Sequence, residues 1–140
     1  MTKLLVPVDG SANAERAVAH AIATAKAMGG AEVVLLNVQE RLDRWFAHGL
    51  NSDAARAHLR EAGEAASAGA RKLLDASGCN YRFDIVFGHP AEVIARVASE
   101  LGCDGIVMGT RGLGEMESVF LGSTSYKVVH MASVPVTLVR

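Results

Sequence analysis

The sequence predicts an α/β fold in which an open, five-stranded parallel sheet carries helices on both faces. Short apolar runs alternate along the chain with segments whose apolar residues recur at helical spacing. The runs are apolar almost throughout, which is typical of strands buried on both faces. Half of the 140 residues are hydrophobic and 21% are charged, as in globular proteins. The length fits a single domain over residues 1–140.

Local patterns predict the first two strands and the helix between them. A continuous apolar run predicts a strand over 3–8. Alanines and valines at helical spacing follow it, with Ser11 suited to the N-cap and Gly29 and Gly30 suited to the helix end. The run AEVVLLNV predicts the second strand, over 31–38.

An irregular stretch and a long helix follow the second strand. The stretch covers 39–52 and contains Trp45 and Phe46. We interpret these two as a small satellite core under the loop, in preference to a lid or a partner surface. The helix is predicted to run to about Ala76. Glycines within it lower its helix propensity, so it depends on tertiary packing.

The same alternation continues in the second half of the chain. Residues 81–87 alternate in polarity, as expected of a strand near an edge, and Pro90 suits the first position of the next helix. A further apolar run predicts a strand over 104–109. Another helix is expected from Ser123 onward.

The last strand is predicted over 134–140 at an edge of the sheet, because Pro135 cannot donate to a ladder. This strand is apolar and has little charge to block pairing with another strand. Pairing with the same strand of a second chain about a two-fold axis would satisfy both edges. We therefore expect a homodimer through residues 134–140.

These patterns leave two strand orders open, 3-2-1-4-5 and the flavodoxin-like 2-1-3-4-5. Cys79 and Cys103 precede the third and fourth strands, which are neighbours in the second order and about 14 Å apart in the first. Only the second order would allow a disulfide between them. The cysteines fit no zinc spacing, and we interpret both as small, reduced core residues.

Charge and hydropathy argue against two classes of partner. The formal net charge is −1 and the pI is about 6.5, so no basic surface for nucleic acid is indicated. No apolar run approaches the ~20 residues needed to span a bilayer. The residues that open the sequence lack the apolar stretch of a secretory leader. We expect a cytoplasmic protein that binds neither nucleic acid nor membrane.

The stretch GTRGLGEMESVFLGS, over 109–123, carries the chemistry of the candidate site. It follows a predicted strand, and Gly109 and Gly112 would let backbone N–H groups approach phosphate oxygens. A helix that opens at Gly122 and Ser123 would present unpaired N–H groups to the same anion. Tight turns and an ordinary helix cap are the alternative explanation of these residues.

Side chains near this stretch also suit an anion. Ser123, Thr124 and Ser125 supply hydroxyl donors, and Arg111 supplies a fixed positive charge. Asp9 follows the first strand and would lie at the opposite lip if the strand order is 3-2-1-4-5, because ligands bind where that order reverses. Taken alone, Arg111 is equally typical of a solvated surface and Asp9 of a turn.

The sequence contains no recognisable catalytic set. There is no G-x4-G-K-[ST] segment to supply a phosphate-binding lysine, and no acidic pair is placed to hold Mg²⁺ beside phosphates. No Ser-His-Asp or Cys-His set is indicated. We interpret the five histidines as surface or cap residues, because they lack ligand spacing. They are His20, His48, His58, His89 and His130. No catalytic or metal-ligating residue is predicted.

The spacing Gly109-x2-Gly112-x9-Gly122-Ser123 matches the G-x2-G-x9-G-[S/T] motif of the ATP-binding branch of the universal stress proteins. The segments LLVPVDGS, VLLNV, GHPAEVIARVA, DGIVMGTRG and PVTLVR resemble the family's other signatures, in the same order. The resemblance covers nearly the whole chain except about 39–80. It implies the strand order 3-2-1-4-5 and a homodimer joined through the last strand.

The resemblance also implies where an adenine nucleotide, ATP or AMP, would bind. Adenine would lie near Asp9 and the backbone of Val38. Ribose would lie by the end of the first strand and Gly109, and phosphates over Gly112 and the start of the last helix. The position of Arg111 varies in the family. The nucleotide-binding residues expected are Pro7, Val8, Asp9, Val38, Met108, Gly109, Arg111, Gly112, Gly122, Ser123, Thr124 and Ser125.

We expect a nucleotide-binding regulatory protein of the universal stress type, acting in a stress response through nucleotide-dependent shape or partners. The alternatives are a slow ATPase or self-phosphorylating enzyme, and a dimeric scaffold that binds no nucleotide. Mg²⁺ beside the nucleotide has no support in the sequence. Valine at Gly109 or Gly122 is expected to abolish binding, by filling the phosphate space and by straining a backbone at positive φ.

Overall fold

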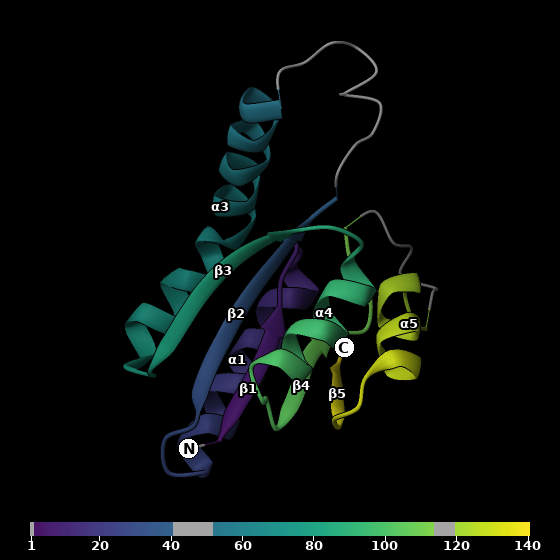
Figure 1. Cartoon of the computed structure of the whole chain (residues 1–140). Coiled ribbons are helices and arrows are strands. Elements are labelled where there is room, and N and C mark those ends of the chain that lie inside the picture. Colours follow the sequence, from purple (N-terminus) through teal and green to yellow (C-terminus); the bar gives the residue numbers. More distant parts are fainter. Residues whose placement is uncertain (1, 41–51, 114–119) are drawn as a thin grey trace.

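Helices and strands alternate along the chain as the sequence predicts (Figure 1). The computed structural model describes residues 2–40, 52–113 and 120–140. Trp45 and Phe46 lie outside these residues, so the interpretation of their loop stays a prediction. The strands are β1 (Lys3–Pro7), β2 (Glu32–Gln39), β3 (Tyr81–Phe87), β4 (Gly105–Gly109) and β5 (Val136–Val139). The helices are α1 (Ala12–Ala27), α3 (Ser52–Ser77), α4 (Pro90–Glu100) and α5 (Ser123–Met131).

The five strands form one parallel sheet in the order β3-β2-β1-β4-β5. This confirms the order that the resemblance implies and rules out the flavodoxin-like alternative. In the centre, Leu5 of β1 lies opposite Val34 of β2 on one side and Ile106 of β4 on the other. The order reverses between β1 and β4, and β3 and β5 form the two edges.

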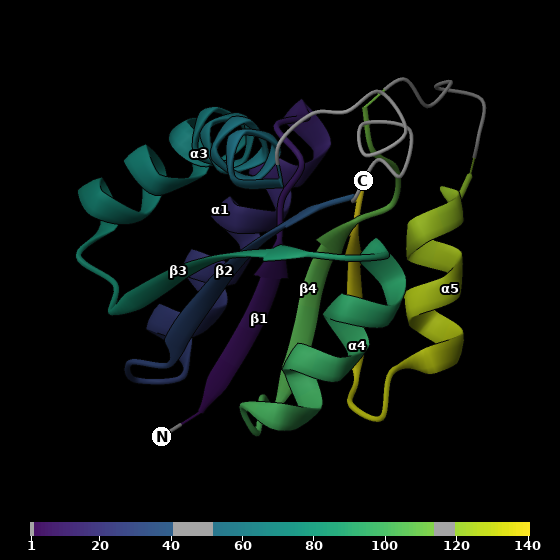
Figure 2. The same ribbon diagram turned by 45° about the horizontal axis from the view of Figure 1, so that its top comes forward.

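Two layers of helices cover the sheet because successive strand residues point to opposite faces. On one face, Leu4 and Val6 of β1 pack in a core with residues of α1 and α3. On the other face, Leu5 packs in a second core with residues of α4 and α5. Figure 2 shows the pair α1 and α3 on one side of the sheet and the pair α4 and α5 on the other.

Local chemistry fixes the helix boundaries. The Ser11 side chain caps α1 by accepting a hydrogen bond from the backbone N–H of Ala14 at 3.1 Å. Gly29 and Gly30 follow α1 with φ of +78° and +114°, a conformation that other residues rarely adopt. Pro90 opens α4 as predicted.

The last strand is shorter than predicted, and it lies at the sheet edge as expected. It covers Val136–Val139 rather than 134–140. Pro135 precedes the strand, and its carbonyl still accepts a hydrogen bond from the backbone N–H of Ile106 at 2.9 Å. The carbonyl of Val139 accepts from the backbone N–H of Thr110 at 3.0 Å. These two bonds join both ends of β5 to β4.

The two cysteines are free thiols on opposite faces of the sheet. Cys79 packs against the core under α1 and α3, whereas Cys103 is buried in the core under α4 and α5. Burial raises the pKa of the Cys103 thiol above its ordinary value. Cys103 is a core residue as predicted, whereas Cys79 is only partly buried at the margin of the other core.

Candidate functional site

A pocket of about 250 Å³, here called the site pocket, opens at the carboxyl ends of β1, β2 and β4. It lies where the strand order reverses, which is the usual place for a ligand in an open α/β sheet. Its walls come from the loops after β1 and β4, the end of β2 and the first turns of α1, α4 and α5. The lining residues are Pro7, Val8, Asp9, Ala14, Val38, Pro90, Ile94, Met108, Gly109, Arg111, Gly112, Leu113, Gly122, Thr124 and Ser125.

Every predicted site residue except Ser123 lines the site pocket. Ser123 is the first residue of α5, and its side chain is exposed. Four lining residues were missed by sequence reasoning, and they are Ala14, Pro90, Ile94 and Leu113. The pattern that predicts a buried face for α4 includes Ile94, but it does not tell which part of that face borders a ligand.

Asp9 joins the two loops that form the lips of the site pocket. Its Oδ1 accepts a hydrogen bond from the backbone N–H of Ser11 at 3.0 Å, and its Oδ2 accepts one from the backbone N–H of Leu113 at 3.0 Å. Both bonds lie within the fold, so the first role of Asp9 is to hold the loop after β4 against the loop after β1. A carboxylate oxygen has two lone pairs, which leaves acceptor capacity for a ligand.

The motif glycines give room to neighbouring side chains of the chain itself. A Cβ at Gly109 would lie 2.7 Å from Cγ of Asn13 and 3.2 Å from its backbone carbonyl carbon, so β4 packs directly on the start of α1. A Cβ at Gly112 would meet Oδ2 of Asp9, the oxygen that accepts from Leu113. Glycine at both positions therefore keeps the loop in contact with Asp9 and Asn13.

The backbone strain expected at Gly109 and Gly122 is absent, and that part of the prediction is wrong. Neither residue is among the described glycines with positive φ. Gly122 has φ −68° and ψ 161°, an extended conformation that other residues adopt readily. A side chain at Gly109 is opposed by the closeness of α1 rather than by the backbone dihedral angle.

The start of α5 borders the site pocket through Gly122, Thr124 and Ser125. Gly122 is the N-cap of α5, and its N–H donates to the carbonyl of Thr110 at 2.6 Å. The next N–H groups of a helix have no partner within it and carry positive partial charge. Ser125 is buried, and its hydroxyl donates to the carbonyl of Gly109 at 2.8 Å. The hydroxyl hydrogen of Ser125 is thus used within the fold, and its oxygen can still accept.

The end of β2 presents backbone groups to the other side of the site pocket. The carbonyl of Leu36 faces β1, because it accepts from the N–H of Val8 at 2.9 Å. In a parallel ladder the N–H and C=O of a residue point to the same neighbour, and those of the residue two positions on do likewise. Val38 therefore directs its peptide groups toward the side where β1 has ended and the site pocket begins.

Asn13 is a residue of the site region that sequence reasoning missed. It is only 5% exposed in the first turn of α1, and both polar atoms of its amide are hydrogen-bonded. Its Nδ2 donates to the carbonyl of Val139 at 2.9 Å, and its Oδ1 accepts from the N–H of Arg111 at 3.0 Å. One signal in the sequence could have found it. Asn13 precedes Ala17 by one helical turn on the buried face of the predicted helix, where a polar side chain needs hydrogen-bond partners.

Within 2–40, 52–113 and 120–140, no group of three or more His, Cys, Asp or Glu residues could hold a metal ion. None of the helices in these ranges has the length and apolar character needed to cross a bilayer.

Comparison with known proteins adds to this geometry. The model of the universal stress protein family matches residues 1–140. A universal stress protein of Thermus aquaticus is 40% identical over 139 residues, which cover 98% of this chain and 97% of that protein. The solved structure of MJ0577 from Methanocaldococcus jannaschii superposes with a TM-score of 0.84 at 30% identity, covering 99% of this chain and 94% of the other.

A universal stress protein crystallised in complex with cAMP has a TM-score of 0.75 and covers 99% of this chain and 97% of its own. At 22% identity, this similarity shows the common fold. The five-stranded order, the pocket where that order reverses, and the match of the family model along 1–140 agree with one another. The chain belongs to the universal stress protein family.

Proposed function

We propose that the chain binds an adenine nucleotide, ATP or AMP, in the site pocket and acts as a nucleotide-dependent regulatory protein of the universal stress type. One observation carries the proposal. The glycine-rich loop after β4, the start of α5, Asp9 and the end of β2 border a single pocket. The spacing of Gly109, Gly112, Gly122 and Ser123 also matches the motif of the ATP-binding branch. The choice of ligand rests on these residues of the chain itself.

Each part of the nucleotide has a partner of suitable chemistry. The peptide groups of Val38 offer a donor and an acceptor, as the edge of adenine requires, and Asp9 offers further acceptor capacity beside them. Gly109 and the end of β1 would border the ribose. The phosphates would lie over Gly112, where the first N–H groups of α5 and its positive dipole end attract an anion.

A regulatory role fits these groups better than rapid hydrolysis. The sequence lacks the lysine of a G-x4-G-K-[ST] loop, which would contact the outer phosphates of ATP. The groups assigned to the site bind and orient, and none of them has an assigned role in transferring a proton or a phosphoryl group. Turnover measured with and without Mg²⁺ would show whether a slow ATPase activity accompanies binding.

We also propose that two copies associate through residues 134–140. The carbonyls of Pro135 and Val139 face β4, so the peptide groups of Val136 and Leu138 face the open edge. No residue of β5 is charged. The exposed large apolar side chains on α5 and β5 are Tyr126, Val129, Met131 and Leu138.

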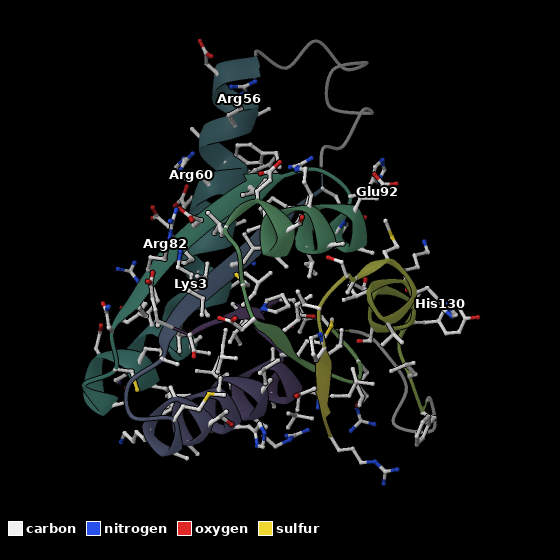
Figure 3. All side chains as sticks on the ribbon, turned by 60° about the horizontal axis from the view of Figure 1, so that its bottom comes forward. Lys3, Arg56, Arg60, Arg82, Glu92 and His130 are labelled. Carbon is white, nitrogen blue, oxygen red and sulfur yellow. The ribbon has the colours of Figure 1, made fainter. Side chains whose placement is uncertain are left out.

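The other edge of the sheet is protected by charge. Arg82 and Asp84 form an ion pair of 2.8 Å on β3, and the guanidinium of Arg71 lies 4.8 Å from the ring centre of Phe83. Figure 3 shows Arg82 together with Arg60 of α3 on this side, away from His130 of α5. Charged groups on an edge strand oppose pairing with another chain, which leaves β5 as the edge available for it.

Calorimetric titration of nucleotide-free protein tests the proposed function. Wild type is expected to bind ATP with micromolar affinity. Gly112→Ala is expected to weaken binding at least about tenfold, since its Cβ displaces the Asp9 carboxylate that holds the loop. Gly105→Ala, in β4, is the matched control. Its Cβ would lie 3.5 Å from the carbonyl oxygen of Pro135 and 3.6 Å from Cδ2 of Leu4, which are ordinary van der Waals contacts.

Two outcomes of that titration would contradict the proposal. Wild-type protein that binds neither ATP nor AMP at millimolar concentration would overturn the assignment of the ligand. A folded Gly112→Ala variant with wild-type affinity would overturn the placement of the phosphates. Mass spectrometry of small molecules released from freshly purified protein adds an independent measurement of what the site pocket holds.

A further inference from the structure

The Asn13 side chain joins three segments that are far apart in the sequence. Its amide packs on Gly109 at the end of β4, where a Cβ would lie 2.7 Å from Cγ of Asn13. Its Oδ1 accepts from the N–H of Arg111 in the loop of the site pocket, and its Nδ2 donates to the carbonyl of Val139 at the end of β5. The partners fix the orientation of the amide, because a carbonyl can only accept and an N–H can only donate.

The carbonyl of Val139 is the meeting point of the pocket loop and the edge strand. It accepts from the N–H of Thr110 at 3.0 Å as well as from Asn13 at 2.9 Å. The carbonyl of Thr110 in turn accepts from the N–H of Gly122, the N-cap of α5. The end of β5 is therefore connected by hydrogen bonds to both segments that would surround the phosphates.

We propose that Asn13 is a positioning residue that couples occupancy of the site pocket to the edge strand β5. A ligand that orders the loop from Gly109 to Leu113 fixes the N–H of Arg111 and with it the Asn13 amide. The fixed amide then holds the carbonyl of Val139 and reduces opening of β5. This inference rests on the proposed nucleotide function and adds to it the route by which binding reaches the surface proposed for a second copy.

Arg16 supplies a comparison within the same helix. Its Nε donates to the carbonyl of Arg140 at 2.8 Å, so it also joins α1 to the residue that follows β5. Arg16 is exposed and does not line the site pocket. Loss of either side chain removes one hydrogen bond between α1 and the β5 end, but only loss of Asn13 removes a contact with the pocket loop.

Amide hydrogen exchange of the segment 136–140, followed by mass spectrometry with and without saturating ATP, tests the coupling. Wild type and Arg16→Ala are expected to show exchange slowed at least about fivefold by ATP. Asn13→Ala is expected to show less than about a twofold change at ATP saturation. Light scattering on each sample establishes that its mass is equal with and without ATP, so that self-association does not account for the protection.

Asn13→Asp provides a second variant if Asn13→Ala does not fold. A carboxylate can still accept from the N–H of Arg111, but it cannot donate to the carbonyl of Val139. ATP is therefore expected to bind this variant without slowing exchange in 136–140.

The possible failures are distinguishable. Wild type that does not bind ATP would overturn the proposed function and this inference with it. Wild type that binds ATP while exchange in 136–140 stays unchanged would overturn the inference alone. Protection by ATP that persists in a folded Asn13 variant, or that is lost equally in Arg16→Ala, would show that Asn13 has no coupling role.

Discussion

The glycines of the loop after β4 leave room for side chains that hold the loop in place. Gly112 leaves room for the Asp9 carboxylate, and Gly109 leaves room for the Asn13 amide. Both of these side chains hold the loop in place through hydrogen bonds to backbone N–H groups. The room beside each glycine is thus taken by a side chain of the fold itself, and a substitution at either glycine is expected to displace the loop that would contact the phosphates.

Substitution at Gly109 tests this requirement separately from ligand binding. Gly109→Ala is expected to lower the free energy of unfolding by about 1–3 kcal/mol, because its Cβ overpacks the contact between β4 and Asn13. Gly105→Ala, four residues earlier in β4, is expected to stay within about 0.5 kcal/mol of wild type. Urea denaturation of the two variants without nucleotide measures the difference. Equal stabilities would show that the packing at Gly109 is not tight.

Apart from the residues that the resemblance implies, the site could be predicted from the sequence only where its chemistry is local. Gly112 and Gly122 mark a loop by composition, and Asp9 marks the turn after an apolar run. Asn13 was missed because its partners, Arg111 and Val139, lie 98 and 126 positions away along the chain. A hydrogen bond over such a distance depends on the packing of α1 beside β4 and β5, which no local pattern specifies.

At the scale of elements, boundaries set by caps agree best with the sequence. Ser11 and Pro90 act on backbone groups within one helical turn, so the starts of α1 and α4 follow directly from them. The last strand is shorter than its apolar run, since Pro135 lies outside it. The apolar run in the sequence begins at Val134, but the strand begins at Val136, where pairing with β4 starts.

The open edge of β5 leads to a prediction about assembly. Leu138 is 37% exposed on this strand, whereas Val136 packs against the core and is a poor site for a charge. If wild type forms the proposed dimer, Leu138→Lys is expected to be monomeric at tens of micromolar, because like charges would meet near the two-fold axis. Light scattering measures the mass.

Leu73→Lys is the control for that experiment. Leu73 is 40% exposed on α3, on the opposite side of the molecule from β5, so the same substitution there is expected to leave the dimer intact. Wild type that stays monomeric at this concentration would contradict the proposed association. Dissociation caused equally by both substitutions would indicate a general loss of folding instead.

For the molecule as a whole, the strand order was the feature that periodicity left open. Two orders satisfied the alternation of strands and helices, and the resemblance to the family selected the one that the structure has. The segments at 3–8 and 104–109 carry no local feature that makes them neighbours. Their pairing depends on the right-handed crossovers and on how the helices pack on the two faces of the sheet. Both are properties of the complete sheet.

The two layers give each cysteine a different reactivity. Cys103 is 5% exposed, and burial raises the pKa of its thiol, so little of the reactive thiolate exists near neutral pH. Cys79 is only partly buried. Alkylation by iodoacetamide at pH 8 is expected to modify Cys79 at least about tenfold faster, and mass spectrometry measures both rates. Equal rates are expected in urea.

Oxidation supplies the complementary measurement. The sheet separates the two thiols, so mild oxidation is expected to give no disulfide between Cys79 and Cys103 within one chain. Such a disulfide in folded protein would contradict the arrangement of the layers. Raising the pH through the folded pKa of Cys103 is expected to destabilise the protein, because ionisation of a buried thiol is less favourable in the folded chain than in the unfolded one.

The central position of β1 has a consequence for how the protein is made. The strand is synthesised before β4, which is one of its two neighbours, and the bond from the Lys3 N–H to Asp104 spans 101 positions. On a ribosome, β1 can pair with β2 long before β4 emerges. Until then, the edge of β1 that will pair with β4 has no partner. Closing a loop of that length is slow. We therefore expect the nascent chain to expose an apolar strand edge during translation, which is the kind of surface that chaperones shield.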